Sequence, residues 1–538
     1  MAGFWTLTRL ILRRDRVKLP IWIGSIVLSL LAMVPMLKDI YGDSGSLAVL
    51  HQTFGTNPAG LFLTGPMDAP TFGALMTIET LLWWGLAIAF MNTLFIIRHT
   101  RHNEEIGAQE LILSGRVHRR TSLFSALFVA FLVNLVMAIF IGAGMSLVSD
   151  SWSAQSGWLY GLSLGLFGWV WAVIAALVAQ LVESGRSANG ILAGLIGLTF
   201  ILRGIGDFLG TTNAEGLVEP TWISTLSPFG WLQATRALTF PEWTPLLFPV
   251  ICTIILIPIA IWLLDIRDVG AGILPARKGR ARARRWLTTN LGLAWRLQRA
   301  IFTGWLIGVI VMVITIGALV PQMASVYQSS DNMKALIVAM GGQGALIPTF
   351  LSAMLSVIVL MVLAYAIQAL SKLRGEEASG HLESILATKT SRFKWLVSHG
   401  SIILIGSVIM LTLAGALLAG AVTIWSNYEA SIGEYILAGL SYFPVVGLFV
   451  GLYVLLFGLL PRTASLVTWL YFGFVTFALW IAPMLKLDQW IMNLSVMSHL
   501  AAAPAEAIKW QPLLVLSVAA LGGLFAGIAA FRRRDGQG

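Results

Sequence analysis

The sequence is poor in charged residues, and this shortage excludes most classes of soluble protein. Only 11% of the 538 residues are Asp, Glu, Lys or Arg, whereas 57% are hydrophobic. Because soluble domains carry roughly 25% charged residues, this chain lacks the polar side chains that would cover a water-facing surface of its own size. Lipid is therefore expected to be its main solvent.

Cysteine is nearly absent as well. The single thiol, Cys252, lies inside an apolar run, so the sequence offers no disulfide framework and no cysteine-ligated metal site. The sequence also lacks a G-x-x-x-x-G-K-[ST] phosphate loop, an H-E-x-x-H motif and a G-x-S-x-G motif, and its seven His residues are scattered. We therefore expect no catalytic residue, no metal site and no ATP hydrolysis in this chain: it is not an enzyme by itself.

Long apolar runs are what the sequence has in abundance. A spanning helix needs ~20 mostly apolar residues, and about twelve segments reach that length. They lie near residues 19–37, 73–97, 122–148, 157–182, 189–209, 244–265, 301–320, 346–371, 395–424, 435–460, 466–485 and 511–531. The runs are continuously apolar rather than alternating, which favours helices over a β-barrel. The expected fold is an all-α membrane protein with about twelve transmembrane helices.

The basic residues favour one orientation in the membrane. If the N-terminus is cytoplasmic, most of the 35 Lys and Arg residues lie on that same side, in residues 1–18, 98–121, 266–300, 372–394 and 532–534. Since Lys and Arg accumulate in cytoplasmic loops, both termini are expected to be cytoplasmic. The net charge of +10 is then explained by basic rims that face anionic lipid, and no nucleic acid partner is expected.

One charged stretch occurs twice. Residues 101–113 read RHNEEIGAQELIL and residues 374–386 read RGEEASGHLESIL, and both continue the pattern R-x2-E-x2-G-x2-E-x2-L-x5-R without a gap. The pattern aligns Arg101, Glu104, Gly107, Glu110, Leu113 and Arg119 with Arg374, Glu377, Gly380, Glu383, Leu386 and Arg392. Two weaker echoes, SGRSA (184–188) with LPRTA (460–464) and WTPLL (243–247) with WQPLL (510–514), occupy equivalent places. An internal duplication is therefore expected.

The duplication predicts three parts: an N-terminal six-helix half at residues 1–266, a basic cytoplasmic linker at 267–284, and a C-terminal six-helix half at 285–538. Since each half holds an even number of spans, the halves form a parallel repeat. Each copy of the charged stretch is expected to be a short helix at the membrane surface, with a break near Gly115 in one half and near residues 388–391 in the other. Residues 4–22 and 288–305 are expected to form amphipathic interfacial helices before the first and seventh spans.

The repeated pattern resembles the E-x-x-G-x-x-E-L-L signature in the first cytoplasmic loop of permeases of type-2 ABC (ATP-binding cassette) exporters. It resembles most specifically the fused twelve-span branch of polyketide antibiotic or multidrug exporters, the tetronasin-resistance-like permeases. In that family the loop is a coupling helix that inserts into a groove of the ATP-hydrolysing subunit, and the amphipathic segments are elbow helices. The resemblance assigns coupling to Glu104, Gly107, Glu110, Leu113, Glu377, Gly380, Glu383 and Leu386. The first copy departs from the usual Thr-Pro-Val-Ser-Arg kind of sequence, with GRVHRR at 115–120.

The resemblance implies the permease subunit of an ATP-driven exporter in the bacterial plasma (inner) membrane, moving hydrophobic or amphipathic compounds of the antibiotic or multidrug type out of the cell. The implied partners are two copies of an ABC ATP-binding subunit, which carry ATP and Mg²⁺, together with membrane lipids and hydrophobic small-molecule cargo. This chain itself is expected to bind no cofactor.

Residues inside the spans supply candidates for a substrate pathway. Glu79, whose repeat-related position is Ser352, either lines a cavity or makes a plain hydrogen bond to a neighbouring helix. Trp83, Trp84 and Trp171 offer an apolar site for cargo, although packing and interfacial belts explain Trp equally well. The pair Arg203 and Asp207, four residues apart, favours a structural ion pair.

Two other functions compete with the exporter. A proton-coupled secondary multidrug transporter also has two six-span halves, but the buried acids are few and the Gly-x-x-x-Asp-Arg-x-Gly-Arg pattern is missing between spans two and three. A scaffold or signalling protein would use the same docking surface without moving cargo, yet it would not need a duplicated twelve-span core.

Overall fold

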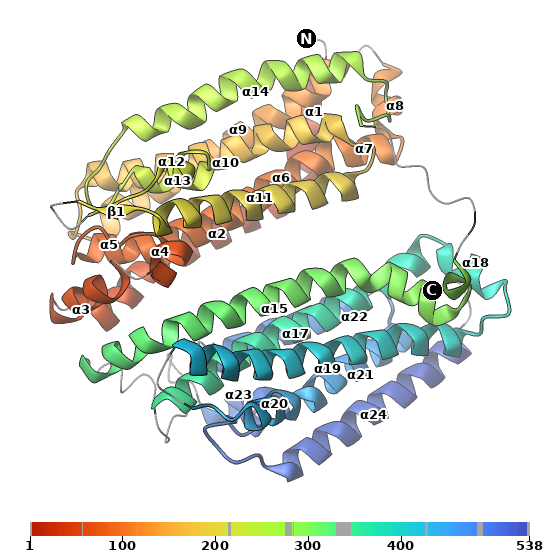
Figure 1. Cartoon of the computed structure of the whole chain (residues 1–538). Coiled ribbons are helices and arrows are strands. Elements are labelled where there is room, and N and C mark those ends of the chain that lie inside the picture. Colours follow the sequence, from red (N-terminus) through yellow and green to blue (C-terminus); the bar gives the residue numbers. More distant parts are fainter. Residues whose placement is uncertain are drawn as a thin grey trace. The chain divides into compact units, whose positions relative to one another are not determined.

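The computed structural model describes residues 3–42, 44–55, 58–115, 117–213, 217–274, 282, 284–329, 346–425, 429–480, 482 and 488–534. Within these ranges the chain is helical almost throughout, and its strands are a two-residue antiparallel pair, β1 (Thr211–Thr212) with β2 (Val218–Glu219). The expected all-α fold is confirmed. The chain divides into two compact units, residues 1–279 (unit 1) and residues 280–538 (unit 2) (Figure 1).

Unit 1 is a bundle of long apolar helices with short helices at both ends. Its helices are α1 (Phe4–Arg14), α2 (Lys18–Tyr41), α3 (Ser44–Phe54), α4 (Pro58–Thr64), α5 (Phe72–Met76), the π-helix η1 (Thr77–Leu81), α6 (Leu82–His99), α7 (Arg101–Glu105), α8 (Ala108–Leu113), α9 (Arg119–Val148), α10 (Ala154–Leu181), α11 (Gly185–Phe208), α12 (Trp222–Thr225), α13 (Pro228–Ala234), the 3-10 helix η2 (Thr244–Leu246) and α14 (Leu247–Ile266). The most buried of the long helices is α10, which packs against α6, α9 and α14.

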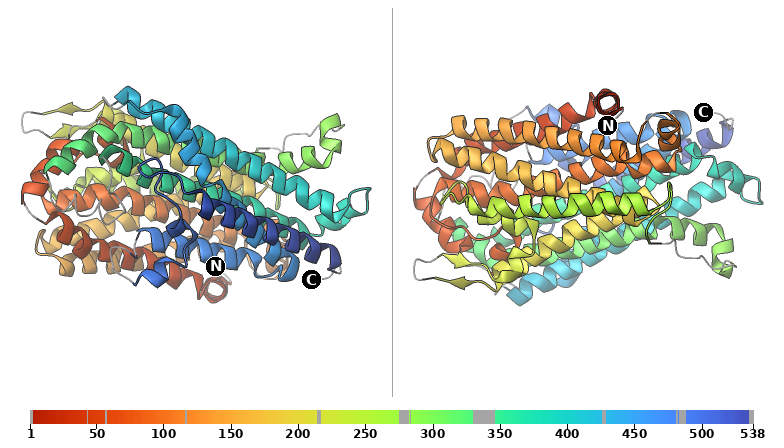
Figure 2. Two further views of the ribbon diagram at one scale, coloured as in Figure 1. Left: turned by 90° about the horizontal axis from the view of Figure 1, so that it is seen from below. Right: turned by 90° about the horizontal axis from the view of Figure 1, so that it is seen from above.

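Unit 2 is built in the same way. Its helices are the 3-10 helix η3 (Arg285–Thr288), α15 (Asn290–Ser329), α17 (Leu346–Ala378), α18 (His381–Leu386), α19 (Arg392–Trp425), α20 (Ile432–Ser441), α21 (Phe443–Leu459), α22 (Ala464–Trp480), α23 (Gln489–Met492), the 3-10 helix η4 (Val496–His499) and α24 (Trp510–Arg533). Its core helix is α17, which packs against α15, α19 and α21. Both views in Figure 2 show the long helices of each unit running alongside one another.

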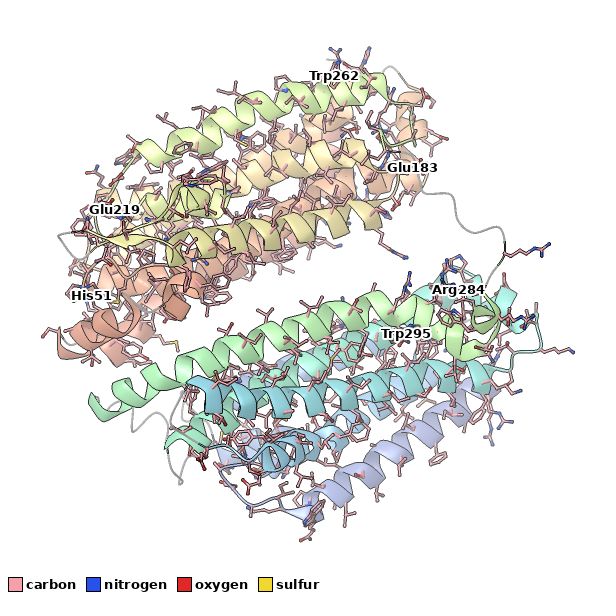
Figure 3. All side chains as sticks on the ribbon, viewed as in Figure 1. His51, Glu183, Glu219, Trp262, Arg284 and Trp295 are labelled. Atoms are coloured by element: carbon pink, nitrogen blue, oxygen red, sulfur yellow. The ribbon has the colours of Figure 1, made fainter. Side chains whose placement is uncertain are left out.

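Among the described residues, 11 helices are long and apolar enough to cross a membrane. The remaining predicted span, residues 466–485, corresponds to α22, which has 17 residues. The predicted number of twelve transmembrane helices is therefore not confirmed. The prediction of a multi-pass membrane protein is confirmed. The long helices carry exposed apolar side chains: Trp262 on α14 points away from unit 1 (Figure 3) and is 60% exposed.

The segment before the first span forms a separate amphipathic helix, α1, because a polar turn ends it. The carboxylate of Asp15 is buried and pairs with Arg98 at 2.6 Å and with His99 at 2.5 Å, which holds the turn against the end of α6. Unit 2 differs: residues 290–305 are the first part of α15 and continue into the span. Since α15 has no acidic residue in that segment and no Pro before Pro321, nothing interrupts its helix there.

Short helices close the end of each unit that is remote from the repeated stretch (Figure 1). In unit 1 they are held by Arg203 and Asp207 of α11, whose side chains are fully buried and 3.1 Å apart. Arg203 also donates to three carbonyls at the C-terminal end of α4, at 2.7 to 3.3 Å. Asp207 accepts hydrogen bonds from Ser224 at 3.1 Å and from Gln233 at 3.0 Å. The expected structural ion pair is thus found, and it joins α4, α12 and α13 to α11.

Candidate functional site

The repeated stretch forms the same turn in both units. Gly107 and Gly380 adopt left-handed backbones with φ of 72° and 75°, and each begins a short helix, α8 or α18. A Cβ at either glycine would meet no atom within 4 Å, so the backbone conformation, and not crowding within this chain, requires glycine. The short helices end at Leu113 and Leu386, before the breaks that the sequence predicts.

Replacing Gly380 by Ala is expected to destabilise this turn by roughly 1–2 kcal/mol, the cost of a left-handed conformation for a residue with a Cβ. Gly375→Ala is the matched control, because Gly375 lies in ordinary helix five positions earlier and has equally open surroundings. The control should be neutral or slightly stabilising. Thermal unfolding of the two purified variants in detergent measures the difference, and equal melting temperatures would contradict the expectation.

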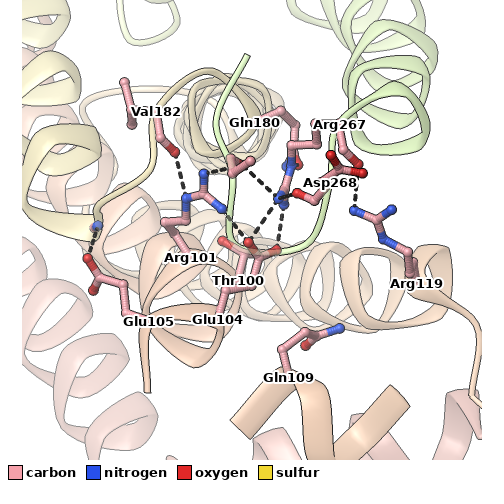
Figure 4. Close-up of polar contacts among 12 residues, drawn as sticks. Thr100, Arg101, Glu104, Glu105, Gln109, Arg119, Gln180, Val182, Arg267 and Asp268 are labelled. Atoms are coloured by element: carbon pink, nitrogen blue, oxygen red, sulfur yellow. Dashed lines mark hydrogen bonds and ion pairs between the residues drawn. The ribbon is translucent and has the colours of Figure 1, made fainter. Parts of the chain in front are cut away.

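Glu104 lies inside a buried network in unit 1 (Figure 4). Its two carboxylate oxygens accept from the guanidinium of Arg267 at 2.5 and 2.9 Å, and it also pairs with Arg101. Arg101 in turn donates from Nε to the carbonyl of Val182 at 2.6 Å, and Arg267 donates from Nε to Gln180 at 2.8 Å. The side chain of Glu104 is only 9% exposed. Its carboxylate is therefore occupied within the chain.

Glu377 contacts two arginines in unit 2, as Glu104 does in unit 1. It pairs with Arg374 at 3.3 Å and with Arg534, and Arg534 also donates to the carbonyl of Phe457 at 2.6 Å. Burial lowers the pKa of Arg534, and the nearby positive charge of Arg374 acts in the same direction. Arg534 still carries its charge near neutral pH, since arginine is protonated far above that range.

The last arginine of the repeated pattern completes each network. Arg119 donates to the backbone carbonyl of Arg267 at 2.9 Å, and Arg392 donates to the backbone carbonyl of Arg534. We call these two sets the clamps: Arg101, Glu104, Arg119 and Arg267 form clamp 1, and Arg374, Glu377, Arg392 and Arg534 form clamp 2. Contacts within the chain thus account for three of the six repeated positions: the first arginine, the first glutamate and the last arginine. The left-handed backbone accounts for the repeated glycine.

Sequence reasoning did not find Arg267 and Arg534. Arg267 begins the predicted linker, yet residues 273 and 274 of that linker bond back to the end of α10, so the segment up to 274 lies against unit 1. A signal was present: each arginine follows the last apolar run of its half and precedes an aspartate in the sequence. Glu105 was also missed, and it accepts from the backbone N–H of Gly185 at 2.8 Å, joining α7 to the start of α11.

The other repeated positions have different surroundings. Glu110 and Glu383 are exposed near the start of α8 and α18. Leu113 and Leu386 are half-buried, and Leu386 packs against the core of unit 2. Each unit therefore presents one repeated carboxylate to its surroundings on a short helix that the clamp residues flank in the sequence. Such an arrangement can receive a basic partner surface, since carboxylates bind guanidinium and ammonium groups strongly.

The structure does not gather the four pathway candidates on one surface. Glu79 lies in the π-helix η1 and is partly buried, and Trp83 is 40% exposed. Trp84 donates from Nε1 to the carbonyl of Ile26 at 3.1 Å, which ties α6 to α2. Trp171 is fully buried in α10. Their place in a substrate pathway stays a prediction.

Comparison with known proteins gives the family. The family model described as "Multidrug efflux system permease Rv1217c, C-terminal domain" matches residues 7–264 and residues 287–532, one range in each unit. The chain is also 30% identical over 537 residues to the multidrug efflux system permease protein Rv1217c of Mycobacterium tuberculosis, with 99% of this chain and 95% of that protein covered. This chain belongs to the Rv1217c-like family of multidrug efflux system permeases.

Proposed function

We propose that this chain is the transmembrane permease subunit of an ATP-driven ABC exporter, which moves hydrophobic or amphipathic compounds out of the cell. Family membership supports the permease role. The observation that carries the ATP-driven part is the repeated turn: Gly107 and Gly380 place the exposed carboxylates Glu110 and Glu383 on equivalent short helices. Energy would come from two copies of a separate ATP-binding subunit, one for each short helix, which hold ATP and Mg²⁺.

The residues of the repeated stretch divide into two roles in this proposal. Glu110 and Glu383 contact the ATP-binding subunits by accepting charge-assisted hydrogen bonds from basic side chains. Gly107 and Gly380 set the direction of the short helices, and Leu113 and Leu386 seat them on their unit. Glu104 and Glu377 act by position, because their carboxylates already bind arginines of this chain.

We also propose which membrane holds the chain and which residues the cargo passes. The chain lies in the bacterial plasma (inner) membrane with both termini in the cytoplasm, within the tetronasin-resistance-like branch, so that the repeated stretch meets a cytoplasmic ATPase. Cargo passes Glu79, with Trp83 and Trp84 offering apolar surface beside it and Trp171 supporting the wall from inside α10.

Co-purification tests this function. The tagged chain, expressed in its own host and extracted in mild detergent, should bring down an ATP-binding protein with a phosphate-loop motif at about two copies per permease. Glu110→Lys combined with Glu383→Lys should reduce its recovery roughly tenfold or more, since each reversal removes a charged hydrogen bond of ~1.5–3 kcal/mol. Glu219→Lys combined with Glu434→Lys is the matched control, with one exposed carboxylate per unit outside the repeated stretch. The proposal fails if wild type recovers no such ATPase, or if both double variants recover it equally.

A further inference from the structure

We infer that Arg267 and Arg534 are positioning residues that connect the last long helix of each unit, α14 or α24, to the segment leading into the short helix of the repeated stretch. That segment is α7 before α8 in unit 1 and the end of α17 before α18 in unit 2. The inference rests on the proposed function, because the motion that it describes is driven by the ATP-binding subunits. It adds a route by which that motion reaches the membrane-spanning helices.

Each arginine stands where two elements meet. Arg267 is the residue that follows α14, and its guanidinium is held by Glu104 of α7 and Gln180 at the end of α10. Glu104, Leu113 and Arg267 also line one small cavity of about 20 Å³, so clamp 1 adjoins Leu113, the last residue of α8. Arg534 likewise follows α24 and reaches Glu377 and the end of α21. Glu104 and Glu377 lie three residues before the glycines that begin α8 and α18. A displacement of either short helix therefore reaches the end of a spanning helix through this adjoining segment.

The contact between the glutamate and the positioning arginine occurs in both units, which argues against a chance contact. The glutamate and its arginine are 163 residues apart in unit 1 and 157 residues apart in unit 2, so the chain between them differs in length. The pairing is the same in both units nevertheless. In both, the pattern's last arginine also holds the backbone carbonyl of the positioning arginine. The glutamate also pairs with the pattern's first arginine in both units. The two copies therefore share three contacts, although their connecting segments differ in length.

The chemistry of the contact suits a rigid connection. A guanidinium that binds both oxygens of a carboxylate, as that of Arg267 binds Glu104, fixes its distance and its orientation, which a single ammonium donor does not. Arg534 binds one oxygen of Glu377. The two clamps differ in stiffness: Arg101 of clamp 1 is fully buried, whereas Arg374 of clamp 2 is 26% exposed. Because solvent weakens a charge pair, Arg267 is expected to matter more than Arg534.

The test measures coupling rather than binding. Wild-type chain with its ATP-binding subunit is reconstituted in vesicles, and the cargo moved per ATP hydrolysed is recorded. We expect Arg267→Gln to keep the ATP-binding subunit and basal ATP hydrolysis but to lower cargo-stimulated hydrolysis and cargo per ATP roughly tenfold, within the range of typical coupling energies. Arg534→Gln should show a smaller loss, and Arg267→Lys should recover part of it by restoring the charge.

Arg120→Gln is the matched control. Arg120 also bridges to α14, by an exposed ion pair of 2.6 Å with Asp265, but it is outside both clamps. It should leave cargo per ATP unchanged. Unchanged cargo per ATP in both Arg267→Gln and Arg534→Gln would overturn the inference, and so would a loss of thermal stability without a change in that ratio. If Arg267→Gln does not fold, Arg267→Lys and Arg534→Gln decide the question. A wild-type chain that moves no cargo with ATP would instead overturn the proposed function.

Discussion

Replacing Arg203 by Met should destabilise unit 1 by ~3–5 kcal/mol, the cost of breaking a buried ion pair from one side. The substitution leaves the carboxylate of Asp207 buried without its positive partner, and only Ser224 and Gln233 would still donate to it. It also removes the donors that cap the C-terminal carbonyls of α4. We expect a large fall in the temperature at which the purified protein loses its monodisperse state in detergent.

The control for this prediction is Arg120→Met. That arginine also belongs to an ion pair, with Asp265, but both side chains are substantially exposed. Exposed ion pairs contribute little to stability, so the control should unfold at the wild-type temperature. If Arg203→Met unfolds at the same temperature as the control, then the buried pair does not hold the short helices α4, α12 and α13 in place.

Trp171→Ala should be comparably damaging, at ~3–5 kcal/mol for truncating a buried Trp to Ala. Its ring is fully buried and lies 6.3 Å from the ring of Phe167 and 6.4 Å from that of Phe229, centroid to centroid. Truncation would leave a cavity at the centre of the bundle, next to α13. Trp171→Phe keeps most of the apolar volume and should be much less destabilising. Thermal unfolding of the two variants in detergent measures the effect.

Trp262→Ala serves as the comparison, because the Trp262 side chain is exposed on α14 and points away from unit 1 (Figure 3). It should change stability little. A direct cargo-contacting role for Trp171 would give a different pattern: a stable Trp171→Ala protein with altered transport. That outcome would contradict the packing role that the structure gives to this side chain.

The sequence predicts the spans well because a bilayer requires long apolar helices, and composition reports them directly. It also predicts the breaks beyond Leu113 and Leu386, where the local sequence changes from helix formers to polar residues. It did not predict that α15 is continuous. There the outcome depends on Asp15, which anchors a turn in unit 1 through Arg98 and His99, contacts that are remote in the sequence.

The clamps show the same limit at the candidate site. From the sequence alone, each repeated glutamate is predicted to contact the ATP-binding subunit. The structure instead places Glu104 and Glu377 against Arg267 and Arg534, more than 150 residues away in the chain. The Arg-Asp pair after the last apolar run of each half marks both arginines in the sequence, but the sequence does not show which glutamate each of them contacts. The exposed Glu110 and Glu383 fit the docking role better.

The energy source separates the exporter from a proton-coupled transporter. Both would move hydrophobic compounds through a duplicated bundle. They differ in what drives the movement: an ATP-binding partner at the two short helices in one case, and a proton gradient acting on buried acids in the other.

The most direct measurement is cargo uptake into inverted membrane vesicles that contain the chain and its co-purified ATP-binding subunit. The exporter account predicts uptake of a hydrophobic dye with ATP and Mg²⁺ when the proton gradient has been collapsed, and its loss in the Glu110→Lys, Glu383→Lys double variant. Uptake that a proton gradient drives without ATP, and that the double variant retains, would contradict it.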